Sequence, residues 1–199
     1  MTKKFFTVFI ICMNVSFGAK FISPAYIKES IDGTYKTRAA SIAQLSTTES
    51  SDRSLLNNIV KNYINNKLPD EYIYADDISR KYNYIYRENP EDDSSKFFVL
   101  NIKDNNFQAL DPENCLGVTQ VNVVSPKYCE LRYLQVNPNT KHGKEFQKYK
   151  GIGTAIIDFI KDFFNDRDIV VQPDTAVIDF YLKNKFKFLE ECFMIYRQG

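Results

Sequence analysis

The chain has 199 residues, of which 44% are hydrophobic and 15% aromatic. This length and apolar content predict one well-packed domain and leave little room for a second. The formal net charge is +1, and it becomes about −1 without residues 1–18, which carry two lysines and no acid. Charge-driven binding to nucleic acid or to an anionic membrane is therefore not expected.

The N-terminus has the layout of a secretion signal. Lys3 and Lys4 precede an apolar run from Phe5 to Val15, and Ser16-Phe17-Gly18 supplies small residues near a cleavage point. The run is shorter than the roughly 20 residues needed to cross a membrane. We expect residues 1–19 to be a signal peptide or N-terminal anchor without a stable membrane span. Cleavage implies export to the periplasm or beyond, and an uncleaved cytoplasmic chain leaves the apolar run as the first strand of the fold.

The remaining residues, 20–199, are expected to form the single domain. Residues 20–50 are rich in Ser, Thr and Lys and predict a loose segment, with a weak helix over Lys36–Leu45. A helix follows, capped by Ser51 or Asp52 and ended before Pro69. Its apolar side chains recur with the helical period: Leu55, Leu56, Ile59, Val60, Tyr63 and Ile64.

The next segment, Glu71 to Arg87, is dense in tyrosine and isoleucine, and its tyrosines are spaced by two within each cluster. This spacing predicts an edge strand or hairpin with partly exposed tyrosines. Ordinary packing of these rings is one interpretation, and stacking against a ligand is the other.

Three strands in a row are predicted over Lys96–Lys103, Cys115–Val124 and Glu130–Val136, joined by short connections into an antiparallel meander. An amphipathic helix from Gly151 then crosses over to a strand at 168–171, which can pair parallel to the strand at Glu130. The predicted class is α/β (α+β), with a mixed central sheet flanked by helices.

The start of that helix is a candidate anion site. Lys148 and Lys150 flank two glycines, Gly151 and Gly153, where free backbone N–H groups meet the positive end of the helix dipole. A pyrophosphate fits such a cradle, because glycine has no Cβ to hold it away. The alternative is that the glycines only make a tight entry to a packed helix.

Two motifs in this order resemble the GNAT family of acyl-CoA-dependent N-acetyltransferases. The first joins Leu134-Gln135-Val136-Asn137-Pro138 to Lys148-Tyr149-Lys150-Gly151-Ile152-Gly153, and the second runs from Thr175 through Phe180-Tyr181 to Phe186. The resemblance covers residues 96–199. Lys148 stands where the family prefers Gln or Arg, and Lys185 stands where it has glycine.

The resemblance implies a GNAT fold, whose parallel strand pair diverges in a V near Val136 and Val171 to admit acetyl-CoA as acyl donor. It implies that backbone N–H groups of Leu134, Gln135 and Val136 hold the thioester and pantetheine. The pyrophosphate site implied at the helix start comprises Lys148, Tyr149, Lys150, Gly151, Ile152, Gly153 and Thr154.

Two catalytic residues follow from the same resemblance. Tyr181 matches a family tyrosine that acts as general acid toward the leaving thiolate, and its alternative is an ordinary core aromatic. Glu130 matches a glutamate that deprotonates the amine through water. By strand alternation Glu130 shares a face with Arg132 and Leu134, so an ion pair with Arg132 or Lys127 is the alternative.

The amine acceptor, whether a small molecule or a protein, is not identified by any residue pattern. A second function class keeps the fold as a catalytically degenerate binding or secreted effector module, and the departures at Lys148 and Lys185 motivate it. No metal is predicted, because Cys115, Cys129 and Cys192 lack metal-ligand spacing and are expected to be buried thiols. His142 lies in a polar loop and receives no role.

Overall fold

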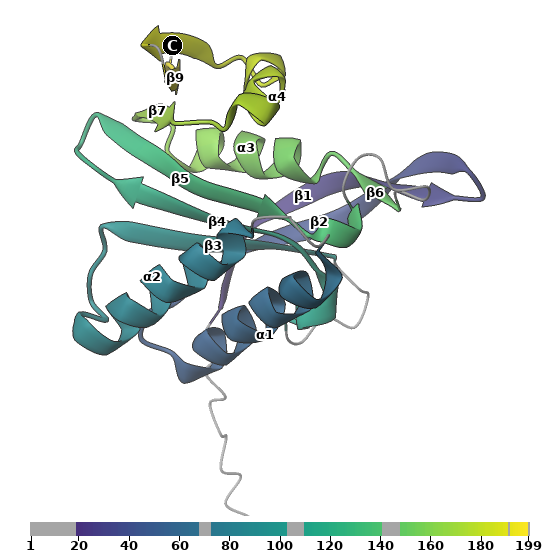
Figure 1. Ribbon diagram of the computed structural model, residues 1–199, viewed down its shortest axis with the longest axis horizontal. Coiled ribbons are helices and arrows are strands. Elements are labelled where there is room, and N and C mark those ends of the chain that lie inside the picture. The colour runs from purple at the N-terminus through teal and green to yellow at the C-terminus, as the bar shows by residue number, and fades with distance from the viewer. Residues whose placement is uncertain (1–18, 68–72, 103–109, 141–147, 191, 199) are drawn as a thin grey trace, which may run out of the picture.

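The computed structural model describes residues 19–67, 73–102, 110–140, 148–190 and 192–198 (Figure 1). The predicted signal segment before Ala19 and the loop containing His142 lie outside these ranges. Nine strands form one sheet in the order β6-β1-β2-β3-β4-β5-β7-β9-β8. Helices α1 and α2 cover one face of the sheet and α3 covers the other (Figure 1).

The sheet begins with a long antiparallel hairpin of β1 (Lys20–Ile31) and β2 (Thr34–Leu45). The predicted loose segment and the weak helix within it are therefore wrong. Asp32 and Gly33 turn the hairpin with φ of 51° and 77°, the left-handed pair that an Asp-Gly turn favours. The second half of β2 is buried on both faces, so its apolar residues do not alternate and its alanines imitate a helix.

Helix α1 (Ser50–Asn66) confirms the predicted helix, but neither proposed residue caps it. The residue at the N-cap is Glu49, without a side-chain cap. Asp52 is instead buried, and its carboxylate accepts a hydrogen bond from the Ser46 N–H at 2.7 Å. Burial raises the pKa of Asp52 despite this bond.

Helix α2 (Tyr74–Glu88) replaces the strand or hairpin predicted over Glu71–Arg87. Its buried residues recur every three or four positions, as one face of a helix requires: Ala75, Ile78, Ser79, Tyr82 and Ile85. The two-residue tyrosine spacing mimicked a strand because Tyr84 lies on the solvent side, 61% exposed, while Tyr82 is fully buried.

The predicted antiparallel meander is confirmed as β3 (Ser95–Ile102), β4 (Cys115–Val123) and β5 (Tyr128–Val136). The predicted crossover is confirmed as well. Helix α3 (Ile152–Phe163) leads to β7 (Asp168–Val171), which pairs parallel to β5. That pairing ends at Leu131 opposite Val171, so the strands separate five residues earlier on β5 than the predicted opening at Val136.

The chain closes with α4 (Ile178–Lys183), β8 (Lys187–Glu190) and β9 (Phe193–Tyr196). A two-residue strand, β6 (Tyr149–Lys150), joins the free edge of β1, and short 3-10 turns η1 (Pro112–Asn114), η2 (Pro138–Thr140) and η3 (Thr175–Val177) occupy connections. Among the helices described, none is long and apolar enough to cross a membrane.

The thiols differ in part from expectation. Cys115 and Cys129 are buried as predicted, but Cys192 is exposed, and all three are free. Within the described ranges no cluster of His, Cys, Asp and Glu has the makings of a metal site.

Candidate active site

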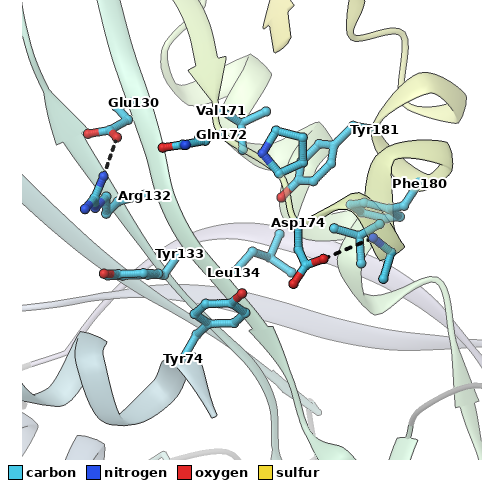
Figure 2. Close-up of a pocket in the computed structure, with 13 residues that line it drawn as sticks. Tyr74, Glu130, Arg132, Tyr133, Leu134, Val171, Gln172, Asp174, Phe180 and Tyr181 are labelled. Atoms are coloured by element: carbon cyan, nitrogen blue, oxygen red, sulfur yellow. Dashed lines mark hydrogen bonds and ion pairs between the residues drawn. The ribbon is translucent and has the colours of Figure 1, made fainter. Parts of the chain in front are cut away.

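A cleft of about 460 Å³ opens where β5 and β7 separate. Its walls come from the start of α2, from β5, from the segment after β7 and from α4 (Figure 2). The lining residues are Tyr74, Glu130, Arg132, Tyr133, Leu134, Val171, Gln172, Pro173, Asp174, Ala176, Val177, Phe180 and Tyr181. Both predicted catalytic residues, Glu130 and Tyr181, are therefore in one cleft, although 51 positions of sequence separate them.

A β-bulge shapes the β5 wall. Tyr133 pairs with Gln120 and Leu131 pairs with Val121, so Arg132 is the extra residue. Leu131 and Leu134 consequently pack into the same core on the α3 side, although they are three residues apart. Glu130 points to the opposite, α2 side, and the prediction that it shares a face with Leu134 is wrong, because alternation does not survive a bulge.

The backbone of β5 presents polar groups to the opening. The Asn137 N–H donates to the Leu116 carbonyl at 2.8 Å, and the Tyr133 carbonyl accepts from the Thr119 hydroxyl at 2.7 Å. These two residues thus face β4, and because successive residues of a strand face opposite edges, Leu134 and Val136 face the opening. The Leu134 N–H and C=O lie past Leu131, the last β5 residue that pairs with β7.

Gln135, the third predicted residue of this segment, has a different position. Its side chain is buried, with the carbonyl accepting from the Tyr74 N–H at 3.1 Å and the amide donating to the Val136 carbonyl at 2.8 Å. It therefore ties the start of α2 to the wall of the cleft.

Tyr181 is 6% exposed, and Figure 2 shows its hydroxyl turned into the cleft. Edge-to-face contacts with Phe180 at 5.1 Å and Phe186 at 5.4 Å hold the ring. Burial, and secondarily Tyr74, raises the pKa of Tyr181 far above its ordinary value near 10. The phenol consequently stays protonated at neutral pH, so it is a hydrogen-bond and proton donor and not a base.

Glu130 lies at the other end of the cleft in Figure 2, paired with Arg132. One carboxylate oxygen accepts from the Arg132 guanidinium at 3.0 Å and the other from the Asn122 amide at 3.2 Å. The ion pair with Arg132, one of the alternatives drawn from the sequence, is thus present, and the carboxylate still lines the cleft.

Asp174 and Tyr74 line the cleft too. Tyr74 belongs to the tyrosine-rich segment for which stacking against a ligand was one interpretation, whereas Asp174 was missed. One Asp174 oxygen accepts from the Ala176 N–H at 3.1 Å, and the side chain has no cationic partner among the described residues. Tyr74 stacks on Tyr133 with ring centroids 5.6 Å apart, and the Asp174 carboxylate contributes, after burial, to a raised pKa of Tyr74. The signal available for Asp174 was its N-cap position before the short helix η3.

The helix entry adjoins this cleft. Gly151 has φ of 80° and is followed by the first N–H groups of α3, which lack a side-chain cap. A Cβ on Gly151 would meet no atom within 4 Å, whereas one on Gly153 would lie 3.0 Å from the Phe180 ring and 3.9 Å from Leu134. Open space for an anion therefore lies at Gly151, and Gly153 permits close packing of α3 on α4.

The other residues of the predicted pyrophosphate site divide between surface and core. The Lys148 ammonium lies 3.7 Å from the Glu29 carboxylate, and that of Lys150 lies 3.9 Å from the centre of the Tyr35 ring. Both lysines thus contact the β1–β2 hairpin. Tyr149 and Ile152 are buried in the core, and Thr154 is exposed.

No family model matches the chain. An uncharacterised N-acetyltransferase from Bacillus methanolicus is 24% identical over 86 residues, which are 43% of this chain and 58% of that protein. The match thus spans less than two thirds of that relative's length.

A solved structure from the GNAT family shows the fold. A member of the GNAT family from Desulfovibrio desulfuricans aligns with a TM-score of 0.53 and 12% identity, covering 80% of this chain and 99% of that chain. A spermidine N-acetyltransferase from Vibrio cholerae, in complex with CoA and spermine, gives a TM-score of 0.46 and 16% identity, covering 80% of this chain and 95% of its own. The mixed sheet with its split between β5 and β7 is the GNAT fold, and the resemblance drawn from the two sequence motifs is confirmed at that level.

Proposed function

We propose that the protein is an acyl-CoA-dependent N-acyltransferase that transfers an acetyl group from acetyl-CoA to an amine. The observation that carries this proposal is the Tyr181 hydroxyl, buried yet turned into a cleft whose other wall is the unpaired edge of β5. The Leu134 N–H and C=O on this edge can hold the pantetheine amides as an added strand does. The uncapped start of α3, next to this cleft, supplies donors for the pyrophosphate.

In the proposed reaction the neutral amine attacks the thioester carbonyl carbon and forms the C–N bond. The carbonyl oxygen becomes negative, and a free β5 N–H at Leu134 stabilises it. The C–S bond then breaks, and the leaving thiolate takes the proton of Tyr181. The nitrogen gives up its own N–H proton as the amide forms, and this proton returns through water to the Tyr181 oxygen, so the phenol is restored. A thiolate bound in the same cleft would lose solvent as Tyr181 does, and this loss favours transfer of the phenol proton to it.

The amine must lose a proton before or during attack. We propose Glu130 as the base that removes it through water, and Asp174 as the carboxylate that attracts the ammonium form into the cleft. The stacked rings of Tyr74 and Tyr133 add faces that attract a cation. These groups support an amine acceptor and do not identify which one.

Tyr181→Phe tests the proposal, because it removes one hydroxyl and leaves the ring packed. Thiol release from acetyl-CoA should be measured with peptide, polyamine and aminoglycoside acceptors. Turnover should fall by roughly 10² to 10⁴ fold while acetyl-CoA affinity stays nearly constant. Tyr196→Phe removes a hydroxyl from β9, outside the cleft, and should keep full turnover. Equal turnover in Tyr181→Phe would refute the general-acid role.

A second candidate is a GNAT-fold module that binds acyl-CoA without turnover. The position of Lys148 favours this candidate. Lys148 stands where the family prefers Gln or Arg, and its ammonium pairs with the Glu29 carboxylate. Acyl-CoA binding by calorimetry, without thiol release for any acceptor, would support this candidate over the enzyme.

Export stays a proposal carried by the residues before Ala19. A cleaved signal predicts a mature chain that begins close to Ala19 or Lys20 and is found outside the cytoplasm. N-terminal sequencing of the native protein decides it, since an intact Met1 in the cytosolic fraction contradicts export.

A further inference from the structure

A second concavity lies between α1 and α2, on the side of these helices away from the sheet. It encloses about 470 Å³ and is lined by Arg53, Asn57, Arg80, Asn83, Tyr84, Arg87 and Glu88. We call it the α1–α2 groove. Asn83 lies nine residues after Tyr74 on α2, roughly 13 Å along the axis at 1.5 Å per residue, so the groove is separate from the acyl-transfer cleft.

The floor of the α1–α2 groove is a hydrogen-bonded network that fixes Arg53. The Arg53 Nε–H donates to the Asn83 Oδ1 at 2.6 Å, and the guanidinium carbon lies 4.9 Å from the centre of the Tyr86 ring. With Nε used inward and the plane held on an aromatic face, the two terminal NH₂ groups are left as donors toward the groove.

The same network orients Asn57. Its Oδ1 accepts from the Ser79 hydroxyl at 2.9 Å and from the Asn83 Nδ2 at 3.0 Å. Because the oxygen of this amide is held inward, its NH₂ group points outward to solvent. Arg53 thus turns its Nε–H toward the helices, and Asn57 turns its Oδ1 the same way. Both side chains present their remaining N–H donors to the groove.

Charge adds to this pattern of donors. Arg87 forms no ion pair or hydrogen bond with a described residue, whereas Arg80 pairs with Asp76 and Asp77 on its own helix. Glu88 is the one carboxylate of the lining. Two guanidinium groups available for a ligand and an amide NH₂ in the lining of the same groove suit a compact anion with several oxygens.

We propose that the α1–α2 groove binds a phosphate group, either inorganic phosphate or a phosphate monoester. A tetrahedral phosphate has enough oxygens for Arg53, Arg87 and Asn57, which line the same groove, whereas a planar carboxylate has two. A polyanion such as nucleic acid requires a longer basic track than these residues provide, and the net charge of +1 offers no wider attraction.

Asn57→Asp is the decisive variant. It keeps an inward oxygen for Ser79 and Asn83 and replaces the outward donor by a negatively charged oxygen. Binding is followed through the NMR resonance of the Arg53 Nε–H during titration with orthophosphate, and separately with phosphoserine, at constant ionic strength. The affinity should fall about tenfold or more in Asn57→Asp and roughly 3- to 10-fold in Arg87→Gln.

Arg197→Gln is the matched control, because it removes the same charge from an exposed position after β9. It should bind phosphate as the native protein does. Tighter binding of phosphoserine than of orthophosphate would assign the groove to a phosphorylated partner, and the reverse order to free phosphate, and both outcomes support the proposal. Resonance shifts no larger than those produced by chloride, or equal affinity in Asn57→Asp and Arg197→Gln, would overturn it.

Discussion

The backbone N–H of Tyr74 donates a hydrogen bond to the side-chain carbonyl of Gln135 at 3.1 Å. This bond links two elements that are 61 residues apart in sequence, and it sets the position of α2 against the wall of the cleft. The other end of Gln135 satisfies the Val136 carbonyl at the open edge of β5. One buried amide thus fixes the start of α2 against β5 and satisfies a carbonyl at the opening.

Gln135→Leu leaves the Tyr74 N–H and the Val136 carbonyl without this partner. We expect the free energy of unfolding to fall by about 2 kcal/mol, as for unpaired buried polar groups, and acyl transfer to fall with it because Tyr74 moves. Urea unfolding measures the first effect. Gln44→Leu on β2 is a control with no side-chain hydrogen bond in the described structure and should change stability by about 0.5 kcal/mol or less.

The roles of the two cleft carboxylates, Glu130 and Asp174, should be distinguishable by their effects on kcat and KM. Glu130→Gln should lower kcat by roughly 10² fold, with part of the loss recovered as pH rises and more of the amine is already neutral. Asp174→Asn should raise KM for the amine with less effect on kcat, since it loses attraction for the ammonium. Recovery at high pH in Asp174→Asn and not in Glu130→Gln would move the base role to Asp174.

Gly151 and Gly33 form a matched pair for testing the anion site. Both have φ near 80° and open space beyond the Cα, so alanine should cost about 1 kcal/mol of stability at either position. Only Gly151→Ala places a methyl group beside the free N–H groups of α3. CoA affinity should fall roughly tenfold there, the loss of one charge-assisted hydrogen bond, and stay constant in Gly33→Ala. Calorimetry showing equal CoA affinity in both variants would place the pyrophosphate elsewhere.

Apolar patterns predicted α1, the meander of β3 to β5 and the α3 crossover, although β3 and β4 are buried on both faces. The patterns failed for β2, whose first half is largely exposed and whose buried second half is rich in alanine. They also failed for α2, where tyrosines spaced by two hid the helical repeat of Ile78, Tyr82 and Ile85. Local motifs located Tyr181, Glu130 and the helix entry, but the cleft also needs Tyr74 and Asp174, which only the tertiary fold brings beside β5.

Buried thiols should make the fold sensitive to alkali. Burial raises the pKa of Cys129 to about 12, and it also raises that of Cys115. Above pH 9 the unfolded chain loses thiol protons that the folded chain retains, so stability is full below pH 9 and decreases as pH rises toward the folded pKa. The slope should be about 1.4 kcal/mol per pH unit for each thiol.

Urea unfolding between pH 8 and 10 measures this slope, which should be shallower in Cys129→Ala. The exposed Cys192 provides the control, and Cys192→Ala should keep the native slope. A slope that Cys129→Ala does not change would contradict a buried, protonated thiol at this position.

Lys185 occupies a backbone conformation that suits glycine. Its φ is 66°, and its N–H donates to the Leu182 carbonyl at 2.9 Å in the turn that follows α4. The turn after α4 therefore holds a left-handed lysine, at a cost of about 1 to 2 kcal/mol in strain. The pKa of the Lys161 ammonium is lowered, mainly by burial. Asp158 opposes this shift, and the nearby positive charge of Lys185 adds to it.

Lys185→Gly should stabilise the protein by about 0.5 to 1 kcal/mol, because the relief of left-handed strain exceeds the extra entropy that glycine gives the unfolded chain. Lys183→Gly is the matched control, since the same replacement in the last turn of α4 should destabilise by about 1 kcal/mol. Urea unfolding of the two variants measures opposite signs if the turn is as described. A loss of stability in Lys185→Gly would mean that the lysine side chain stabilises this turn by more than its backbone strain costs. The position of Tyr181 in the cleft, four residues earlier, would then depend on that side chain.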